Sequence, residues 1–135
     1  MPSKEKDIFR DPVPNRDIAL AFLNQVILGR ISEAFEKYVV RQGFTHHNPY
    51  FRGERESLKQ AMMEAHQKFR NTKLEVQHVF EADDLVAIHS RVKHSPQEPE
   101  IAVVHIFRCA GQKVVELWDI GMQVPKDSPN ENGAF

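Results

Sequence analysis

The chain has 135 residues, and its 18 basic and 19 acidic side chains leave a formal net charge of −1. This balance gives no basic footprint for nucleic acid or for an anionic membrane surface, so we expect neither as a partner. With 41% hydrophobic and 27% charged residues, the chain has the length and composition of one globular domain that can bury a core without disulfides.

Proline and charge gather at the two ends of the sequence. We predict a loosely docked N-terminal arm over residues 1–14, a single domain over 15–124 and a C-terminal tail over 125–135. The arm lacks the apolar stretch of a signal peptide, and the longest apolar stretch, within 18–28, is too short to span a bilayer. We therefore expect a cytoplasmic protein. Its one cysteine, Cys109, lies in an apolar run and is expected to be buried and inert.

The first half of the chain has helical periodicity. Apolar residues recur at helical spacing in three segments, which predicts helices over residues 15–28, 32–40 and 54–69. Gly29 and Gly43 follow the first two segments and are natural helix stops.

The second half is rich in β-branched residues and is interrupted by turn-forming ones. This pattern predicts strands over 74–80, 85–93, 101–109 and 114–122, with a short extra strand near 44–47. Helices followed by strands indicate an α+β fold, in which three N-terminal helices pack on one face of a curved antiparallel sheet.

Hairpin geometry predicts which polar side chains of these strands face each other. A three-residue loop over 111–113 would set Arg108 opposite Glu116 and His105 opposite Asp119, so that opposite charges pair. The same register turns an apolar set to the outer face of the sheet, where a partner could cover it. This set is Val104, Ile106, Trp118 and Ile120.

A five-residue loop over 95–99 would in turn place His89 opposite His105. His89, His105 and Asp119 would then form a row on one face of the sheet. A carboxylate in an apolar pocket tends to have a raised pKa, and a neighbouring imidazole can hold or move a proton, so the row suits general acid–base catalysis. The alternative is a structural hydrogen-bond network that satisfies buried histidines.

The segment over residues 44–49 forms a second polar cluster. Adjacent residues of an extended chain point opposite ways, so one of the two histidines can join the row, and we predict His47. The alternative is a turn at 48–49 with both histidines lining a loop. A metal site built from two histidines and Asp119 is a further alternative. No compact ligand spacing or cofactor-binding motif supports it, so we expect neither a metal nor another cofactor.

Five segments together resemble the SnoaL-like proteins of the NTF2-like (nuclear transport factor 2-like) superfamily. Residues 44–49 (F-T-H-H-N-P) resemble their aromatic-x-Gln-His-Asn-Pro segment. Three strands and the tail carry the rest of the resemblance: 82–90 (A-D-D-L-V-A-I-H-S), 102–108 (A-V-V-H-I-F-R), 114–120 (V-V-E-L-W-D-I) and 130–135 (N-E-N-G-A-F).

The resemblance implies a cone-shaped α+β barrel with a deep pocket, commonly a homodimer through the sheet. SnoaL-like polyketide cyclases catalyse an intramolecular aldol condensation without cofactor or metal, and a pocket aspartate acts as acid and base. The matching position is Asp119, and His105 stands where relatives often have Asp or His. The chain departs from the pattern at His46 (usually Gln), at Asp83 (usually Gly) and at Leu117, where many relatives have His.

These observations lead to the hypothesis of a cofactor-independent enzyme that enolises a small carbonyl compound, as an aldol-type cyclase, isomerase or dehydratase. Asp119 would be the base, aided by His105. The expected substrate-binding residues are His47, Asn48, His89, Phe22, Met62, Phe107 and Leu117. The alternatives are a non-catalytic ligand-binding protein with the same pocket and a dimeric scaffold with a vestigial pocket.

Overall fold

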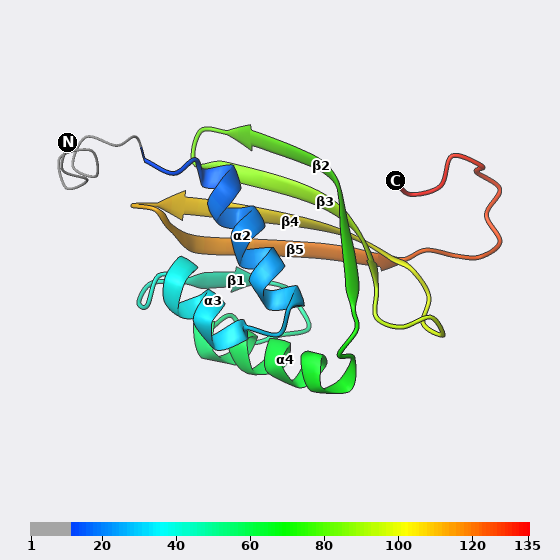
Figure 1. The fold of residues 1–135 in the computed structure, drawn as a ribbon. Helices are drawn as coiled ribbons and strands as arrows, with labels where there is room; N and C mark the ends of the chain where they lie inside the picture. Colours follow the sequence, from blue (N-terminus) through cyan, green and yellow to red (C-terminus); the bar gives the residue numbers. More distant parts are fainter. Residues whose placement is uncertain (1–11) are drawn as a thin grey trace, which may run out of the picture.

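Three helices precede or interrupt a five-stranded sheet in the computed structural model, which describes residues 12–135 (Figure 1). The elements are α2 (Asn15–Ile27), α3 (Ile31–Tyr38), β1 (Thr45–His47), α4 (Arg55–Lys68), β2 (Lys73–Ala82), β3 (Leu85–Lys93), β4 (Ile101–Ala110) and β5 (Lys113–Gln123). Every element expected from the sequence is present, with ends that agree within a few residues. Most of the predicted arm lies outside the described residues.

The strand order is β1-β5-β4-β3-β2, and β2 to β5 form an antiparallel meander. The expectation of a wholly antiparallel sheet is wrong at one edge, because β1 pairs with β5 in parallel and sets His46 beside Leu117. A parallel neighbour requires a long connection, and here α4 and β2 to β4 intervene between β1 and β5. The chain thereby brings residues 45–47 beside residues 116–118 in the first half of β5.

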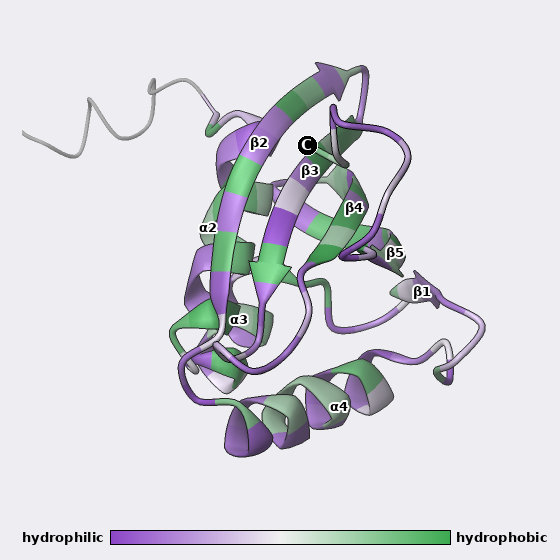
Figure 2. Cartoon of the chain, turned by 90° about the vertical axis from the view of Figure 1, so that its right-hand side faces the viewer, coloured by the Kyte–Doolittle hydropathy of each residue, from purple (hydrophilic) through white to green (hydrophobic). Residues whose placement is uncertain are grey.

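The helices cover one face of the sheet, which we call the inner face. Helix α2 crosses the strands obliquely (Figure 1), whereas α4 packs mainly on α3 and β1 and lies below the sheet (Figure 2). The core between them is centred on three fully buried rings. Phe22 packs edge-on against Phe35 at a centroid distance of 5.4 Å and against Phe107 at 6.0 Å.

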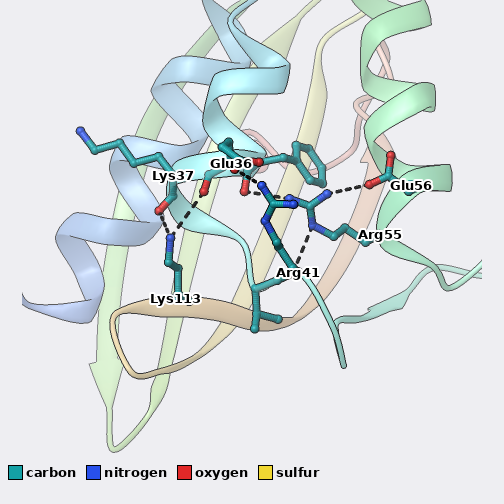
Figure 3. Close-up of polar contacts among 8 residues, drawn as sticks. Glu36, Lys37, Arg41, Arg55, Glu56 and Lys113 are labelled. Carbon is teal, nitrogen blue, oxygen red and sulfur yellow. Dashed lines mark hydrogen bonds and ion pairs between the residues drawn. The ribbon is translucent and has the colours of Figure 1, made fainter.

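The C-terminal end of α3 is held by two basic side chains (Figure 3). Arg55, at the start of α4, donates to the carbonyl oxygens of Phe35 and Val40, each at 3.1 Å. Lys113, at the start of β5, donates to the Lys37 carbonyl at 2.7 Å. The carbonyls at the end of a helix carry partial negative charge, so these contacts stabilise the end of α3 and join it to α4 and β5.

The β4–β5 register agrees with the prediction, although the turn is shorter than expected. Gly111 and Gln112, with φ of 57° and 67°, form a two-residue turn, and a bulge follows between the pairs Cys109–Val114 and Arg108–Glu116. The extra residue of the bulge replaces the third loop residue that we expected. His105 therefore lies opposite Asp119.

The predicted β3–β4 register is wrong by one residue. Ile88, not His89, lies opposite His105, and His89 lies opposite Val104. The reason is that the connection between the strands closes asymmetrically: the last pair is Val92 with Ile101, which leaves Lys93 without a partner on β4. Because successive side chains of a strand alternate between faces, this shift moves His89 to the outer face of the sheet.

Candidate active site

A cavity of about 420 Å³ lies between the inner face of the sheet and helices α2 and α4. Its walls are mostly apolar, with Leu23 and Val26 from α2, Met62 from α4 and Val103 from β4. Its polar lining falls into two groups. One group is Asn48, His105 and Asp119, and the other is Thr72 and His94. Apolar walls with a few placed polar groups are typical of small-molecule sites.

Asp119 is the centre of the first polar group. One of its carboxylate oxygens accepts a hydrogen bond from Nε2 of His46 at 2.8 Å, and the other accepts one from the Asn48 amide. Both donors come from β1 and the turn after it, where alternation places His46 and Asn48 on the inner side and His47 on the outer side. The edge strand β1 and the turn after it therefore supply both hydrogen-bond donors to Asp119.

The Asn48 amide is itself oriented by the backbone. Its side-chain oxygen accepts a hydrogen bond from the Tyr50 N–H at 3.0 Å, which leaves the NH₂ group directed at Asp119. Such a bond from an asparagine side chain to the backbone two residues later is a common turn motif. The Asn48–Pro49 turn thus changes the direction of the chain and also orients the Asn48 amide toward Asp119.

The pKa of Asp119 is lowered, contrary to our expectation of a raised value. Burial raises it, but the hydrogen bonds from His46 and Asn48 to the carboxylate outweigh the burial. The sequence argument considered the apolar pocket alone and missed the two donors. Asp119 is therefore an ionised carboxylate at neutral pH.

His105 is neutral at the same pH. Burial lowers its pKa to about 4, although the neighbouring Asp119 carboxylate acts in the opposite direction. Its ring lines the cavity, and its Nδ1 is buried without a hydrogen-bond partner among the described residues. An ionised carboxylate and a neutral imidazole thus stand side by side on neighbouring strands.

The choice of His47 over His46 as the pocket histidine is wrong. His47 turns to the outer face, where its Nε2 contacts Glu116 at 2.6 Å and its ring stacks on Trp118 at 4.8 Å. Arg108 also donates to Glu116, at 3.0 Å. Alternation shows that one histidine faces inward, but the parallel pairing that decides which one leaves no signal in the sequence.

His89 also lies outside the cavity. Its Nε2 donates to the carbonyl oxygen of Ala134 at 3.0 Å, its Nδ1 lies 2.9 Å from Nδ1 of His78, and its ring stacks on Phe135. The Arg91 guanidinium also lies over the Phe135 ring, 4.3 Å from its centroid. His89 is thus part of the seat of the C-terminal tail on the outer face.

The remaining expected site residues divide between the cavity and the core. Met62 and Asn48 line the cavity, whereas Phe22, Phe107 and Leu117 are fully buried in the core. Sequence reasoning missed His46, Thr72 and His94. His94 follows a strand end, which favours an exposed role and gives no indication of a pocket position.

Other chemistry has little support within residues 12–135. In that part of the chain no group of three or more His, Cys, Asp or Glu side chains is arranged to hold a metal ion. Cys109 is buried, and burial raises its pKa to about 11, so the thiol is protonated and unreactive. None of the helices described there is long and apolar enough to cross a membrane.

Comparison with known proteins supports the fold and the family. An NTF2-like protein of unknown function from Cytophaga hutchinsonii superposes with a TM-score of 0.67 at 16% identity, over 84% of this chain and 95% of that one. A "putative polyketide cyclase" from Acidithiobacillus ferrooxidans gives 0.67 at 17% identity, over 82% and 90%. A "putative SnoaL-like polyketide cyclase" from Shewanella putrefaciens gives 0.63 at 14%, over 87% and 85%.

Likeness at such low identity shows the fold alone, and no curated protein matches the sequence. The family is shown by a sequence model of the SnoaL-like domain, which matches residues 30–117. Asp119 lies two residues beyond the matched segment. The helices, the curved sheet and this match together show that the chain has an NTF2-like fold and belongs to the SnoaL-like domain family.

Proposed function

We propose that this protein binds a small carbonyl compound in the cavity and enolises it without a cofactor, as an aldol-type cyclase, isomerase or dehydratase. The observation that carries the proposal is the pairing of an ionised Asp119 with a neutral His105 at the wall of an apolar cavity. The neighbours from Acidithiobacillus ferrooxidans and Shewanella putrefaciens are named "putative" polyketide cyclases, enzymes that catalyse a reaction of this class.

Asp119 acts as the base in this proposal. It takes a proton from the carbon next to the substrate carbonyl, and the electron pair of that C–H bond moves to form the enolate. His46 and Asn48 hold the carboxylate in place through one lone pair of each oxygen, so another lone pair stays available to the substrate. The proton returns to carbon or passes to the new oxygen when the product forms.

His105 acts as the hydrogen-bond donor to the developing enolate oxygen. Its Nδ1 is enclosed by protein, so we place the single proton of the neutral ring on Nε2. A neutral imidazole can donate a hydrogen bond to an oxyanion while it stays uncharged in the apolar cavity. This division of roles follows from the environments of the two groups, which keep one ionised and the other neutral.

The lowered pKa of Asp119 narrows the substrate class. A weak base removes a proton efficiently only when the C–H group is itself acidic, since proton transfer depends on the difference between the two pKa values. A carbon between two carbonyl groups meets that requirement. We therefore expect a β-dicarbonyl compound.

Benzoylacetone, a β-diketone of suitable size, provides the test. The wild-type protein should accelerate deuterium uptake at its central carbon, and Asp119→Asn should reduce that acceleration by about a hundredfold or more. Asp84→Asn is the matched control, because Asp84 pairs with Arg108 outside the cavity. Undiminished exchange in a folded Asp119→Asn protein would contradict the proposal.

A non-catalytic ligand-binding role is the second candidate, and the same lowered pKa favours it, because it makes Asp119 a poor base. The two candidates differ in the fate of the ligand. Native mass spectrometry of the purified protein, followed by denaturing extraction, would recover an unchanged ligand for a binding protein. An enzyme would convert that compound on incubation.

We also propose that two copies pair through the outer face. Ile120 and Met122 of β5 expose 65% and 56% of their surface there, which is unusual for two neighbouring large apolar side chains on one face of a sheet. The tail covers the β3 side through Phe135, so β4 and β5 remain open to a second copy.

A further inference from the structure

Ser90 is a polar residue in an otherwise apolar part of the core. It follows Ile88 and precedes Val92 on the inner side of β3, and none of its surface is exposed. Its hydroxyl has no hydrogen-bond partner among residues 12–135. Because an unpaired hydroxyl buried away from water is unfavourable, such groups in folded proteins nearly always have a partner. The partner of Ser90 has to come from its immediate surroundings.

A second buried atom of the same kind lies on the neighbouring strand. Nδ1 of His105 is also buried and has no partner within the described part of the chain. The β3–β4 register sets Ile88 opposite His105 and Ser90 opposite Val103, so Ser90 and His105 are diagonal neighbours on the inner side of the sheet. Diagonal neighbours of an antiparallel pair lie about 7–8 Å apart, within reach of each other's side chains. One contact between them would satisfy both atoms.

A single buried water molecule accounts for this contact better than a direct bond. The structure records no direct hydrogen bond between Oγ of Ser90 and Nδ1 of His105. The separation of diagonal side chains is instead suited to two successive hydrogen bonds, each about 2.8 Å long. Buried waters in proteins occupy such positions, where they join polar groups that have no other partner.

The hydroxyl proton sets the direction of the resulting chain of hydrogen bonds. No other acceptor among residues 12–135 takes the proton of Ser90, so Ser90 donates to the water and the water donates to Nδ1. In the neutral ring of His105, the proton then stands on Nε2. The reverse chain, from a protonated Nδ1 through the water to Oγ, would leave the Ser90 proton without an acceptor.

We propose that Ser90 is a positioning residue for His105: through one buried water it holds the ring in the tautomer that carries its proton on Nε2. This inference rests on the proposed function, in which Nε2–H donates to the developing enolate oxygen. The other tautomer would present a lone pair to that oxygen and repel its charge. Ser90 does not line the cavity, so it acts only through His105.

The NMR shifts of the two ring nitrogens of His105 test the tautomer near neutral pH without any substrate. His105→Gln identifies the signals, and the wild-type ring should be protonated on Nε2. Ser90→Ala removes Oγ without enlarging the side chain. It should lower the ratio of the Nε2–H to the Nδ1–H tautomer about three- to tenfold, the effect of one net hydrogen bond. Ser90→Thr keeps the hydroxyl and should keep the wild-type ratio.

Two outcomes of these spectra would overturn the inference. One is a wild-type ring protonated on Nδ1, which requires no variant to be made. The other is an unchanged tautomer ratio in a folded Ser90→Ala protein. Ser32→Ala is the matched control, because it makes the same chemical change on the exposed side of α3 and should leave the His105 signals in place.

Deuterium exchange of benzoylacetone tests whether the tautomer matters for the reaction. Ser90→Ala should lower the rate at saturating benzoylacetone about two- to tenfold and leave KM within about twofold, and Ser90→Thr should restore the rate. A shifted tautomer with a wild-type rate would overturn the positioning role and leave the proposed enzyme intact. Absence of exchange in the wild-type protein, with a tautomer that still depends on Ser90, would reject the enzyme and keep the link between Ser90 and His105.

Discussion

Nε2 of His46 and the carboxylate of Asp119 are joined by a 2.8 Å hydrogen bond across 73 residues of sequence. His46 stands on a strand of three residues, and Asp119 on one of eleven. The ionisation of the candidate base thus depends on the shortest strand of the sheet, and on its parallel pairing with β5. The first prediction tests this dependence with two adjacent histidines.

His46→Leu should raise the pKa of Asp119, because it removes a donor to the carboxylate. The acid limb of the pH–rate profile for benzoylacetone exchange should move to higher pH. Since His46 is buried, the free energy of unfolding should also fall by about 1–3 kcal/mol. His47→Leu is the control, because His47 faces outward. It should leave the pH–rate profile in place and change the free energy of unfolding by less than about 1 kcal/mol. Equal effects of the two changes would contradict the role of His46 as the donor that lowers the pKa of Asp119.

His105 should make the protein less stable in mild acid. Its pKa is lowered to about 4 in the folded state, against 6.5 for a free histidine, so between these values the unfolded chain binds more protons. Stability from His105 is therefore full above pH 6.5 and is lost as the pH falls to about 4, by at most about 3 kcal/mol. His105→Gln should flatten this part of a stability–pH curve obtained by urea titration. A curve identical to wild type would count against the prediction.

Gly29→Ala should destabilise the protein by more than Gly43→Ala. Both glycines have φ near +84°, a conformation that costs other residues about 1–2 kcal/mol. A Cβ at Gly29 would in addition lie 2.3 Å from Nε2 of His66, whereas at Gly43 nothing lies within 4 Å. Thermal unfolding of the two variants separates the backbone cost, which they share, from the displacement of His66. A larger loss at Gly43 would refute this account.

Phe135→Ala should release the C-terminal tail. The ring contacts His89 and Arg91, and no other aromatic group of the tail can replace it. Hydrogen exchange over residues 130–135 should become faster, while the helices and the sheet keep their protection. Glu131→Ala, an exposed change in the same segment, should leave the exchange unaltered. Unchanged exchange in Phe135→Ala would show that the ring contributes nothing to the seat.

Ile120→Lys should dissociate the proposed dimer. The lysine would place a charge in the middle of the outer face, where two copies would have to bury it without a counterion. Leu28→Lys is a matched control, because Leu28 is similarly exposed but follows α2, away from that face. Sedimentation velocity at micromolar concentration should give a dimer for wild type and Leu28→Lys, and a monomer for Ile120→Lys. A wild-type monomer would reject the dimer itself.

Local patterns in the sequence were sufficient to predict the helices, the strands and the register of one hairpin. Apolar spacing gave the helices, and opposite charges at Arg108 and Glu116 gave the β4–β5 register, because side-chain pairs across adjacent strands are a local and strong constraint. The resemblance to SnoaL-like proteins gave the fold. Asp83 also becomes intelligible: its φ of 56° explains why the family pattern has glycine there.

The site was predicted only in part, because non-local pairings compose it. Asp119, His105, Asn48 and Met62 were expected to line the cavity, and they do. His89 was misplaced by a loop whose length could not be derived from its composition. The inward turn of His46 depends on a parallel pairing between segments 73 residues apart, for which neighbouring residues give no constraint.

The bulge beside Gly111 makes the position of Asp119 independent of the length of the β4–β5 turn. Val115 is the residue that the pairing passes over between Val114 and Glu116. Its removal would make the ladder regular and would still leave Arg108 opposite Glu116 and Asp119 opposite His105. A transplant of this hairpin should therefore keep the Arg108–Glu116 pair, whereas the turn beyond that pair can change in length.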